Sequence, residues 1–186
     1  IENGYPIGTD ITKIRQYYDL GARYITLCHS SNNDICDSSS DKGGPEHNGL
    51  SAFGEEVVRE MNRVGMMVDV SHISDESFYD VLAITRAPVI ASHSSCRALC
   101  ESPRNLNDDM LQALKKNGGV IQICILSDYL RQPEPNPEYD AKVKELRDRW
   151  RNEGQELTEE QQEKRWEEFS KLKEQYVKLA TIEDAV

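Results

Sequence analysis

Apolar and polar residues follow two alternating patterns along the first 132 positions of the chain. Short continuous apolar runs, typical of buried parallel strands, alternate with segments whose apolar residues recur every three or four positions, as in helices. The runs that predict strands are 1–4, 24–28, 66–71, 88–92 and 120–125, and the predicted helices are about 10–20, 51–64, 74–86 and 107–117. Polar residues at Ser51, Ser74 and Asn107 predict the starts of the last three helices, and Gly65 and Gly118 predict two of the helix ends. The alternation of strands and helices predicts a parallel β-sheet covered by helices.

A polar segment at residues 30–49 interrupts the repeat. It is rich in Ser, Asn, Asp and Gly, and it is long for a connection inside a compact domain. We therefore expect this segment to serve the function of the protein rather than only to join two elements.

The pattern changes after about residue 132. Three prolines between positions 133 and 137 indicate a linker, and charged residues dominate the sequence that follows. Two helices, Tyr139–Gly154 and Glu159–Ala180, are predicted as a charged hairpin, and residues 158–161 (T-E-E-Q) have the form of a capping box. The expected segments are barrel units at 1–132, a helical insertion at 133–180 and the start of a further barrel segment at 181–186.

The charges of this hairpin are expected to lie on solvated helix faces. Apolar residues recur at helical spacing in its second helix, at Trp166, Phe169, Leu172, Tyr176 and Leu179. This stripe predicts packing against the sheet or against a partner subunit, so a homodimer is one candidate assembly.

Length and charge narrow the classes of protein. The chain has 186 residues, which is short for an eight-unit barrel of about 250 residues, so we expect a piece of a longer protein. Its net charge of −11 argues against a nucleic-acid partner. No apolar run approaches the roughly 20 residues that span a bilayer. No signal peptide is present, and the sequence does not choose between the cell envelope and the cytoplasm.

The five cysteines are Cys28, Cys36, Cys96, Cys100 and Cys124. Their odd number and the absence of a CxxC pair favour free or buried thiols. A single disulfide remains an alternative, whereas a cysteine metal cluster is not expected.

Three of the four histidines follow predicted strands. His29, His72 and His93 each come directly after an apolar run, and Glu2 lies in the first of these runs. The carboxyl ends of barrel strands converge on one mouth, where such folds do their chemistry. Imidazole and carboxylate groups that meet there suit Zn²⁺, although each residue taken alone is more often structural. The fourth histidine, His47, lies in the polar segment and is expected to be solvated.

Arg104 and Asn105 follow the strand of His93 in a predicted loop. An arginine near the mouth of a barrel could bind a substrate carboxylate through two parallel hydrogen bonds. A surface salt bridge is the ordinary alternative for such a residue.

An ordered set of segments matches a known family. They are I-E-N-G at 1–4, Y-I-T-L-C-H-S at 24–30, G-L-S-A-F-G at 49–54, V-D-V-S-H-I-S at 68–74, R-A-P-V-I-A-S-H-S at 86–94 and S-P-R-N-L at 102–106. The chain thereby resembles the membrane (renal) dipeptidase family of zinc peptidases, including its bacterial members, over 1–129 and again over 180–186. The resemblance implies a metal-dependent (β/α)₈ TIM-barrel fold, incomplete in this chain, with the charged hairpin as an insertion.

The resemblance also implies roles for individual residues. Glu2 matches the carboxylate that bridges two zinc ions, and His72 and His93 match the histidines of the second zinc. His29 matches the residue that contacts substrate and stabilises the tetrahedral intermediate, while Arg104, followed by Asn105, matches the substrate-binding motif. The implied activity is hydrolysis of dipeptides, with tolerance of a D-residue at the carboxyl end, by a metal-activated hydroxide.

Two family motifs are missing from the sequence. The H-x-D motif that supplies further ligands of the first zinc is absent, and so is the late G-x-D-F-D-G segment that supplies a catalytic Asp. Both absences fit a chain cut at both ends. Two alternatives stay open: another metal-dependent barrel amidohydrolase, such as a deaminase or cyclic-amide hydrolase, and a catalytically silent fragment whose open sheet edges associate.

Overall fold

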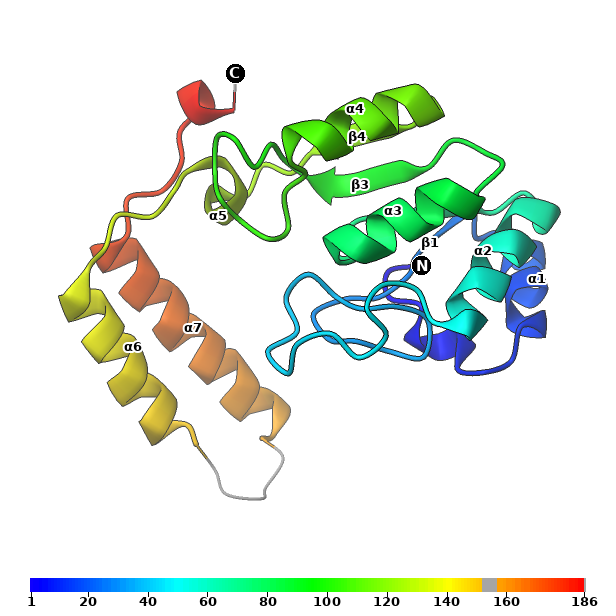
Figure 1. The fold of residues 1–186 in the computed structure, drawn as a ribbon. Coiled ribbons are helices and arrows are strands. Elements are labelled where there is room, and N and C mark those ends of the chain that lie inside the picture. The colour runs from blue at the N-terminus through cyan, green and yellow to red at the C-terminus, as the bar shows by residue number, and fades with distance from the viewer. Residues whose placement is uncertain (152–156, 186) are drawn as a thin grey trace. The chain divides into compact units, whose positions relative to one another are not determined.

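The chain forms two units, Ile1–Leu130 and Arg131–Val186, in a computed structural model that describes residues 1–151 and 157–185. Strands and helices alternate through the first unit (Figure 1). Its elements are η1 (Tyr5–Ile7), α1 (Thr12–Asp19), β1 (Tyr24–Thr26), α2 (Ala52–Val64), β2 (Met67–Asp69), α3 (Asp75–Ile84), β3 (Ile90–Ser94), α4 (Asp108–Asn117), β4 (Val120–Ile123) and α5 (Ser127–Leu130).

The four strands form one parallel sheet in the order β1-β2-β3-β4. Each strand pairs with the next strand along the chain, and the order never reverses, which is the arrangement of consecutive βα units in a barrel rather than of a doubly wound sheet. Neighbouring helices pack in the same sequence, α1 on α2, α2 on α3 and α3 on α4. The predicted α/β fold of the barrel type is confirmed, with four of the eight strands that close a barrel.

The prediction of a strand at residues 1–4 is wrong. Within the described residues this segment makes two strand-like bonds to β1, from the main-chain nitrogen of Ile1 to the Tyr24 carbonyl and from the Thr26 N–H to the Ile1 carbonyl. Asn3 then adopts a left-handed conformation with φ of 72°, which ends any extended pairing. The predicted strand boundaries also shift, because β1 ends at Thr26 and β3 extends to Ser94, so that His93 lies within its strand.

The predicted helix ends are confirmed where polar caps signalled them. Ser51, Ser74 and Asn107 each accept a hydrogen bond from a main-chain N–H in the first turn of α2, α3 and α4. Gly65 and Gly118 end α2 and α4 in the left-handed conformation that glycine adopts without steric cost.

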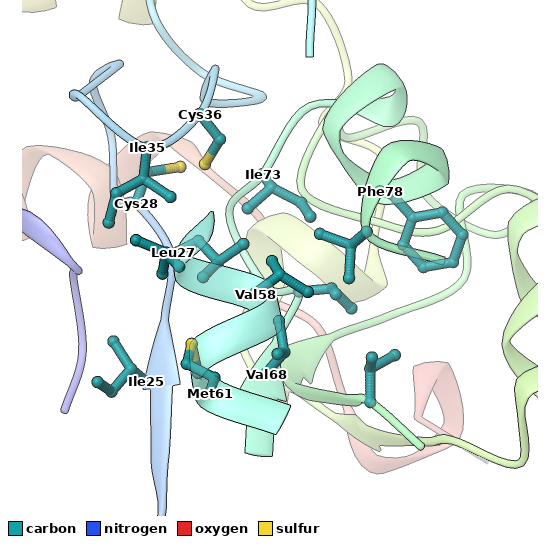
Figure 2. Close-up of a cluster of buried hydrophobic side chains, with 14 of the residues drawn as sticks. Ile25, Leu27, Cys28, Ile35, Cys36, Val58, Met61, Val68, Ile73 and Phe78 are labelled. Atoms are coloured by element: carbon teal, nitrogen blue, oxygen red, sulfur yellow. The ribbon is translucent and has the colours of Figure 1, made fainter. Parts of the chain in front are cut away.

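The core of the first unit lies between the sheet and its helices. Figure 2 shows side chains from β1, β2, α2 and α3 meeting there with Ile35 and Cys36 from the long polar segment. Cys28 and Cys36 are completely buried in this cluster, and all five cysteines are free thiols, as favoured from the sequence. Residues 35–38 of the segment 30–49 are therefore buried, and the segment is not a loose surface loop.

The second unit contains the predicted helical hairpin. Helices α6 (Pro137–Arg149) and α7 (Glu159–Tyr176) lie side by side, followed by η2 (Ile182–Asp184) (Figure 1). Thr158 and Gln161 form the capping box that begins α7. The predicted end of the first helix at Gly154 lies outside the described residues. Helix α7 contains no fully buried residue. In its apolar stripe Phe169, Leu172 and Tyr176 are partly buried, whereas Trp166 and Leu179 are exposed. Homodimer formation stays a prediction.

Among the described helices, none combines the length and the apolar content needed to cross a bilayer.

An ion pair ties the β3–α4 connection to the start of α3. Both terminal nitrogens of Arg97 donate to the Asp75 carboxylate at 2.7 Å, and its Nε donates to the Asn105 carbonyl at 2.9 Å. Such a fork fixes the position of the connection in two directions at once. The pair therefore sets how the loop that follows β3 sits against the loop that follows β2.

We predict that Gly54→Ala destabilises the first unit, although alanine favours helices over glycine by about 1 kcal/mol. A Cβ at this buried position in α2 would overlap the carbonyl oxygen of Ile35, a backbone atom that cannot swing away. Chemical denaturation should show a loss of about 1–3 kcal/mol. Glu56→Ala on the exposed face of the same helix is the control, with a change within about 0.5 kcal/mol. Equal effects of the two variants would contradict the close approach.

We predict that Arg97→Met lowers the free energy of unfolding by about 1–3 kcal/mol, because the half-buried Asp75 carboxylate loses two charged hydrogen bonds. The matched control is Arg63→Met, which removes an equally bidentate pair with Glu60 from an arginine whose side chain is 66% exposed. The control should change stability by less than about 1 kcal/mol. Urea denaturation of both variants tests the difference, and a larger loss in the control would refute it.

Candidate active site

Three histidine rings converge on the carboxylate of Glu2. The Nε2 atoms of His29, His72 and His93 lie 3.5, 3.4 and 3.3 Å from Glu2 Oε1. The Nε2 atoms of His72 and His93 are 2.8 Å apart, and the ring centroids of His29 and His72 are 4.1 Å apart. The structure thus brings together the four residues that the sequence placed at one mouth.

Glu2 reaches this position without belonging to a strand. The main-chain bonds of Ile1 hold the chain start beside β1, and the Asn3 side chain accepts from the Tyr5 N–H to turn the chain away. Gly4 passes so close to the Leu27 carbonyl that a Cβ would overlap it. The Glu2 side chain is therefore delivered to the carboxyl end of β1 by a turn that needs glycine.

The polar segment holds the main chain of two of the histidines. The hydroxyl of Ser38 donates to the His29 carbonyl at 2.5 Å, and the N–H of Ser39 donates to the His72 carbonyl at 2.8 Å. No sequence signal singled out Ser38, because its partners are main-chain atoms from two different connections. The expectation that segment 30–49 serves the site gains a physical basis in these bonds.

Asp37 orders the same segment from inside. Its carboxylate accepts hydrogen bonds from the N–H groups of Glu46, His47 and Gly49 at 2.9–3.1 Å. Burial alone would raise the pKa of Asp37, but these main-chain donors stabilise the charged form and leave the pKa below its usual value. The main chain of residues 46–49 is therefore held in place by the buried carboxylate of Asp37.

His72 is both buried and conformationally strained. Its φ angle is 75°, which is rare for a residue with a large side chain, and the residue is only 6% exposed. Burial, together with the positive charge of Arg104, lowers the pKa of His72 to about 3. The ring is therefore neutral at physiological pH, which is the form that binds metal ions.

His93 is attached to β2 through both its ring and its main chain. Its N–H donates to Ser71 Oγ at 3.0 Å, and its ring Nδ1 lies 2.7 Å from Ser92 Oγ. Ser92 in turn donates to the buried carboxylate of Asp69 at 2.5 Å. Asp69, Ser71, Ser92 and Ser94 all lie close to the ligands in sequence and were candidates for orienting them. The structure connects the first three to His93, whereas Ser94 Oγ has no partner among the described residues.

Arg104 is buried, and the surface salt bridge considered from the sequence is not found among the described residues. It is 7% exposed, and its Nη2 donates to the His93 carbonyl at 3.3 Å. Its Nε and Nη1 have no partner in the described part of the chain, and burial lowers the pKa of this guanidinium from its usual value. The Tyr129 ring lies 5.3 Å from the guanidinium carbon. Tyr129 was not foreseen, because it follows β4 without a motif.

Asn105 lies in the same loop, and its side-chain amide makes hydrogen bonds with main-chain atoms of the protein. Its Oδ1 accepts from the Ser95 N–H at 3.0 Å, and its Nδ2 donates to the carbonyls of Cys100 and Tyr129 at 2.9 Å. The amide thus holds the loop that carries Arg104. Its role in substrate binding stays a prediction.

The fourth histidine lies apart from this group. His47 Nε2 is 2.9 Å from the Asn33 carbonyl, and the ring is half-buried rather than fully solvated as expected. His47 is therefore a suitable control position for substitutions of the histidines that converge on Glu2.

The chemistry of the converging atoms fits a divalent metal. One ligand atom from each of Glu2, His72 and His93 lies within 4.8 Å of the others. Two imidazole nitrogens and a carboxylate oxygen form a ligand set that zinc binds in catalytic sites, where a further position stays open. The neutral state of His72 removes the competition between a proton and the metal.

The match to a known protein family agrees with a metal-binding site at these residues. Residues 1–186 match the family described as membrane dipeptidase (Peptidase family M19). An uncharacterised dipeptidase of Schizosaccharomyces pombe is 48% identical over 134 residues, covering 72% of this chain and 32% of its own length. The chain therefore spans about a third of this relative.

Solved structures agree with the fold. The probable dipeptidase PvdM of Pseudomonas aeruginosa has a TM-score of 0.76 and 30% identity, over 95% of this chain and 48% of its own. A metallo peptidase of Rhodobacter sphaeroides, liganded with a phosphinate mimic of the dipeptide L-Ala-D-Ala, has a TM-score of 0.65 and 26% identity, over 80% of this chain and 45% of its own. With the family match along its whole length, the chain belongs to the membrane dipeptidase family, peptidase family M19.

Proposed function

We propose that the protein containing this chain is a zinc-dependent dipeptidase. The observation that carries this proposal is the buried Arg104, whose Nε and Nη1 have no partner among the described residues although they lie beside the histidine group. Unused donors on a buried guanidinium favour an anionic ligand, and a free carboxylate at the end of a short peptide has the matching geometry.

Each residue of the site has a separate role in the proposed reaction. Glu2, His72 and His93 would hold the metal, with Glu2 shared between two ions in a complete site. Zinc supplies Lewis acidity, which polarises the peptide carbonyl and lowers the pKa of water. His29, at the edge of the group and 44% exposed in its side chain, is placed to donate a hydrogen bond to the oxygen that becomes negative. Arg104 orients the substrate by its carboxylate.

A D-residue at the carboxyl end of the substrate is part of the proposal. The Rhodobacter sphaeroides relative is liganded with a mimic of L-Ala-D-Ala, and its fold covers most of this chain. Rates of hydrolysis of L-Ala-D-Ala and L-Ala-L-Ala by the full-length protein compare the two stereoisomers directly. A preference for the L,L-dipeptide of tenfold or more would refute the proposed use of substrates with a D-residue at the carboxyl end.

The metal assignment predicts that His93→Ala reduces bound zinc in the full-length protein, because one of three converging ligands is lost. Zinc per chain is measured by elemental analysis after dialysis against metal-free buffer. The wild-type protein should hold about two zinc ions and the variant about one. His47→Ala is the matched control and should retain the wild-type content. Wild-type metal content in His93→Ala would refute the assignment.

The carboxylate assignment predicts that Arg104→Met lowers kcat/KM for a dipeptide by about 30-fold or more, since losing a buried charged partner costs at least about 2 kcal/mol. The comparison substrate is the same dipeptide with its carboxyl end amidated. The wild-type enzyme should strongly prefer the free acid, and Arg104→Met should lose this preference. If dipeptide turnover is unchanged in the variant, another metal-dependent amidohydrolase activity becomes the better explanation.

A further inference from the structure

We propose that Asp69, acting through Ser92, fixes the tautomer of His93 that leaves Nε2 unprotonated and directed at the metal site. Asp69 is then a positioning residue for the reaction, although it lies behind the ligands. The inference rests on the proposed zinc site for its functional meaning, but the tautomer itself can be measured without metal.

The first step is that the Asp69 carboxylate only accepts hydrogen bonds. Its Oδ1 accepts from the main-chain N–H groups of Ser71 and Ser92, both at 3.0 Å. Its Oδ2 accepts from the hydroxyls of Thr26 at 2.6 Å and Ser92 at 2.5 Å. Asp69 is fully buried, and the two main-chain N–H groups and two hydroxyls around it supply four donors, which suits a carboxylate that accepts every one of these bonds.

The second step is the proton count at Ser92. A serine hydroxyl carries one hydrogen, and the short bond to Asp69 uses it. Ser92 Oγ can therefore only accept in its 2.7 Å contact with His93 Nδ1, so Nδ1 carries the ring proton. In a neutral imidazole the other nitrogen is then bare, which leaves a lone pair on Nε2.

The third step concerns where the unprotonated Nε2 of His93 points. The bare Nε2 of His93 lies 3.3 Å from Glu2 Oε1 and 2.8 Å from His72 Nε2. The His93 main chain is held at both ends, since its N–H donates to Ser71 Oγ and its carbonyl accepts from Arg104. These main-chain bonds and the contact of Nδ1 with Ser92 Oγ hold the His93 ring so that its Nε2 faces the same two atoms.

The arrangement allows an isosteric test. In Asp69→Asn, the amide oxygen can replace Oδ1 and keep both main-chain bonds, while the amide NH₂ replaces Oδ2 and donates to the two hydroxyls. Ser92 is then free to donate to His93 Nδ1, which favours the tautomer with the proton on Nε2. The number of hydrogen bonds made by residue 69 is unchanged. The amide now donates to the Ser92 hydroxyl, and Ser92 donates to His93 Nδ1 instead of accepting from it.

The tautomer is read by ¹⁵N NMR of the metal-free full-length protein labelled at histidine. We expect His93 in the wild-type protein to show a protonated Nδ1 and an unprotonated Nε2, and Asp69→Asn to show the reverse. The same His93 tautomer in both proteins, or a protonated Nε2 in the wild type, would overturn the proposal.

Zinc affinity, measured by competition with a chromophoric chelator, gives the functional readout. Asp69→Asn and Ser92→Ala should each weaken one zinc site by about 10- to 100-fold, the usual effect of losing a group that orients a ligand. Ser92→Thr keeps the hydroxyl and should restore the affinity. Ser94→Ala is the control, because this buried hydroxyl on the same strand has no partner among the described residues. It should bind zinc like the wild type.

The outcomes separate this inference from the proposed function. If the wild-type protein binds no zinc, the proposed function fails, while the NMR comparison still decides the tautomer. If zinc binds but the affinity of Asp69→Asn and Ser92→Ala equals that of the wild type, the positioning role is refuted. A variant that loses stability without a change of tautomer would show that Asp69 only joins strands, which also refutes it.

Discussion

The buried carboxylate of Asp69 is the constraint on which the site depends. It joins the ends of three strands, because Asp69 ends β2 and its hydrogen-bond donors are Thr26 on β1, Ser71 two residues after β2 and Ser92 on β3. A fully buried charge is costly unless several donors surround it, so the strand ends cannot drift apart without exposing an uncompensated ion. The histidines follow or belong to these same strand ends, and their separation is set by this charge.

A second buried charge organises the other half of the mouth. Asp37 gathers the N–H groups of the polar segment, while its own carbonyl accepts from the Ser74 N–H at the start of α3. The segment then holds the carbonyl of His72, whose left-handed backbone would not persist without such bonds. The closure of this segment over β2 therefore stabilises the strained backbone of His72, whereas its low pKa has two causes, burial and the positive charge of Arg104.

Much of the fold followed from local sequence. Continuous apolar runs predicted the strands, and caps such as Ser51, Ser74 and Gly65 predicted helix ends, because their side chains or φ angles satisfy the helix termini within a few residues. The error at residues 1–4 has the opposite origin. Its composition suits a strand, but the turn at Asn3 depends on Gly4 packing against Leu27, a contact that local pattern does not contain.

The sequence by itself determined which residues would meet, since the strand-end positions of His29, His72 and His93 follow from the βα repeat and the carboxyl ends of parallel strands share one side. It favoured free thiols but left a disulfide open, and the structure has all five cysteines as free thiols. Only the tertiary structure decided the proton arrangement at His93, the burial of Arg104 with unused donors, and the roles of Ser38 and Ser39 in holding the carbonyls of His29 and His72. These properties depend on groups from different elements lying within hydrogen-bond distance, and spacing along one chain does not specify such distances.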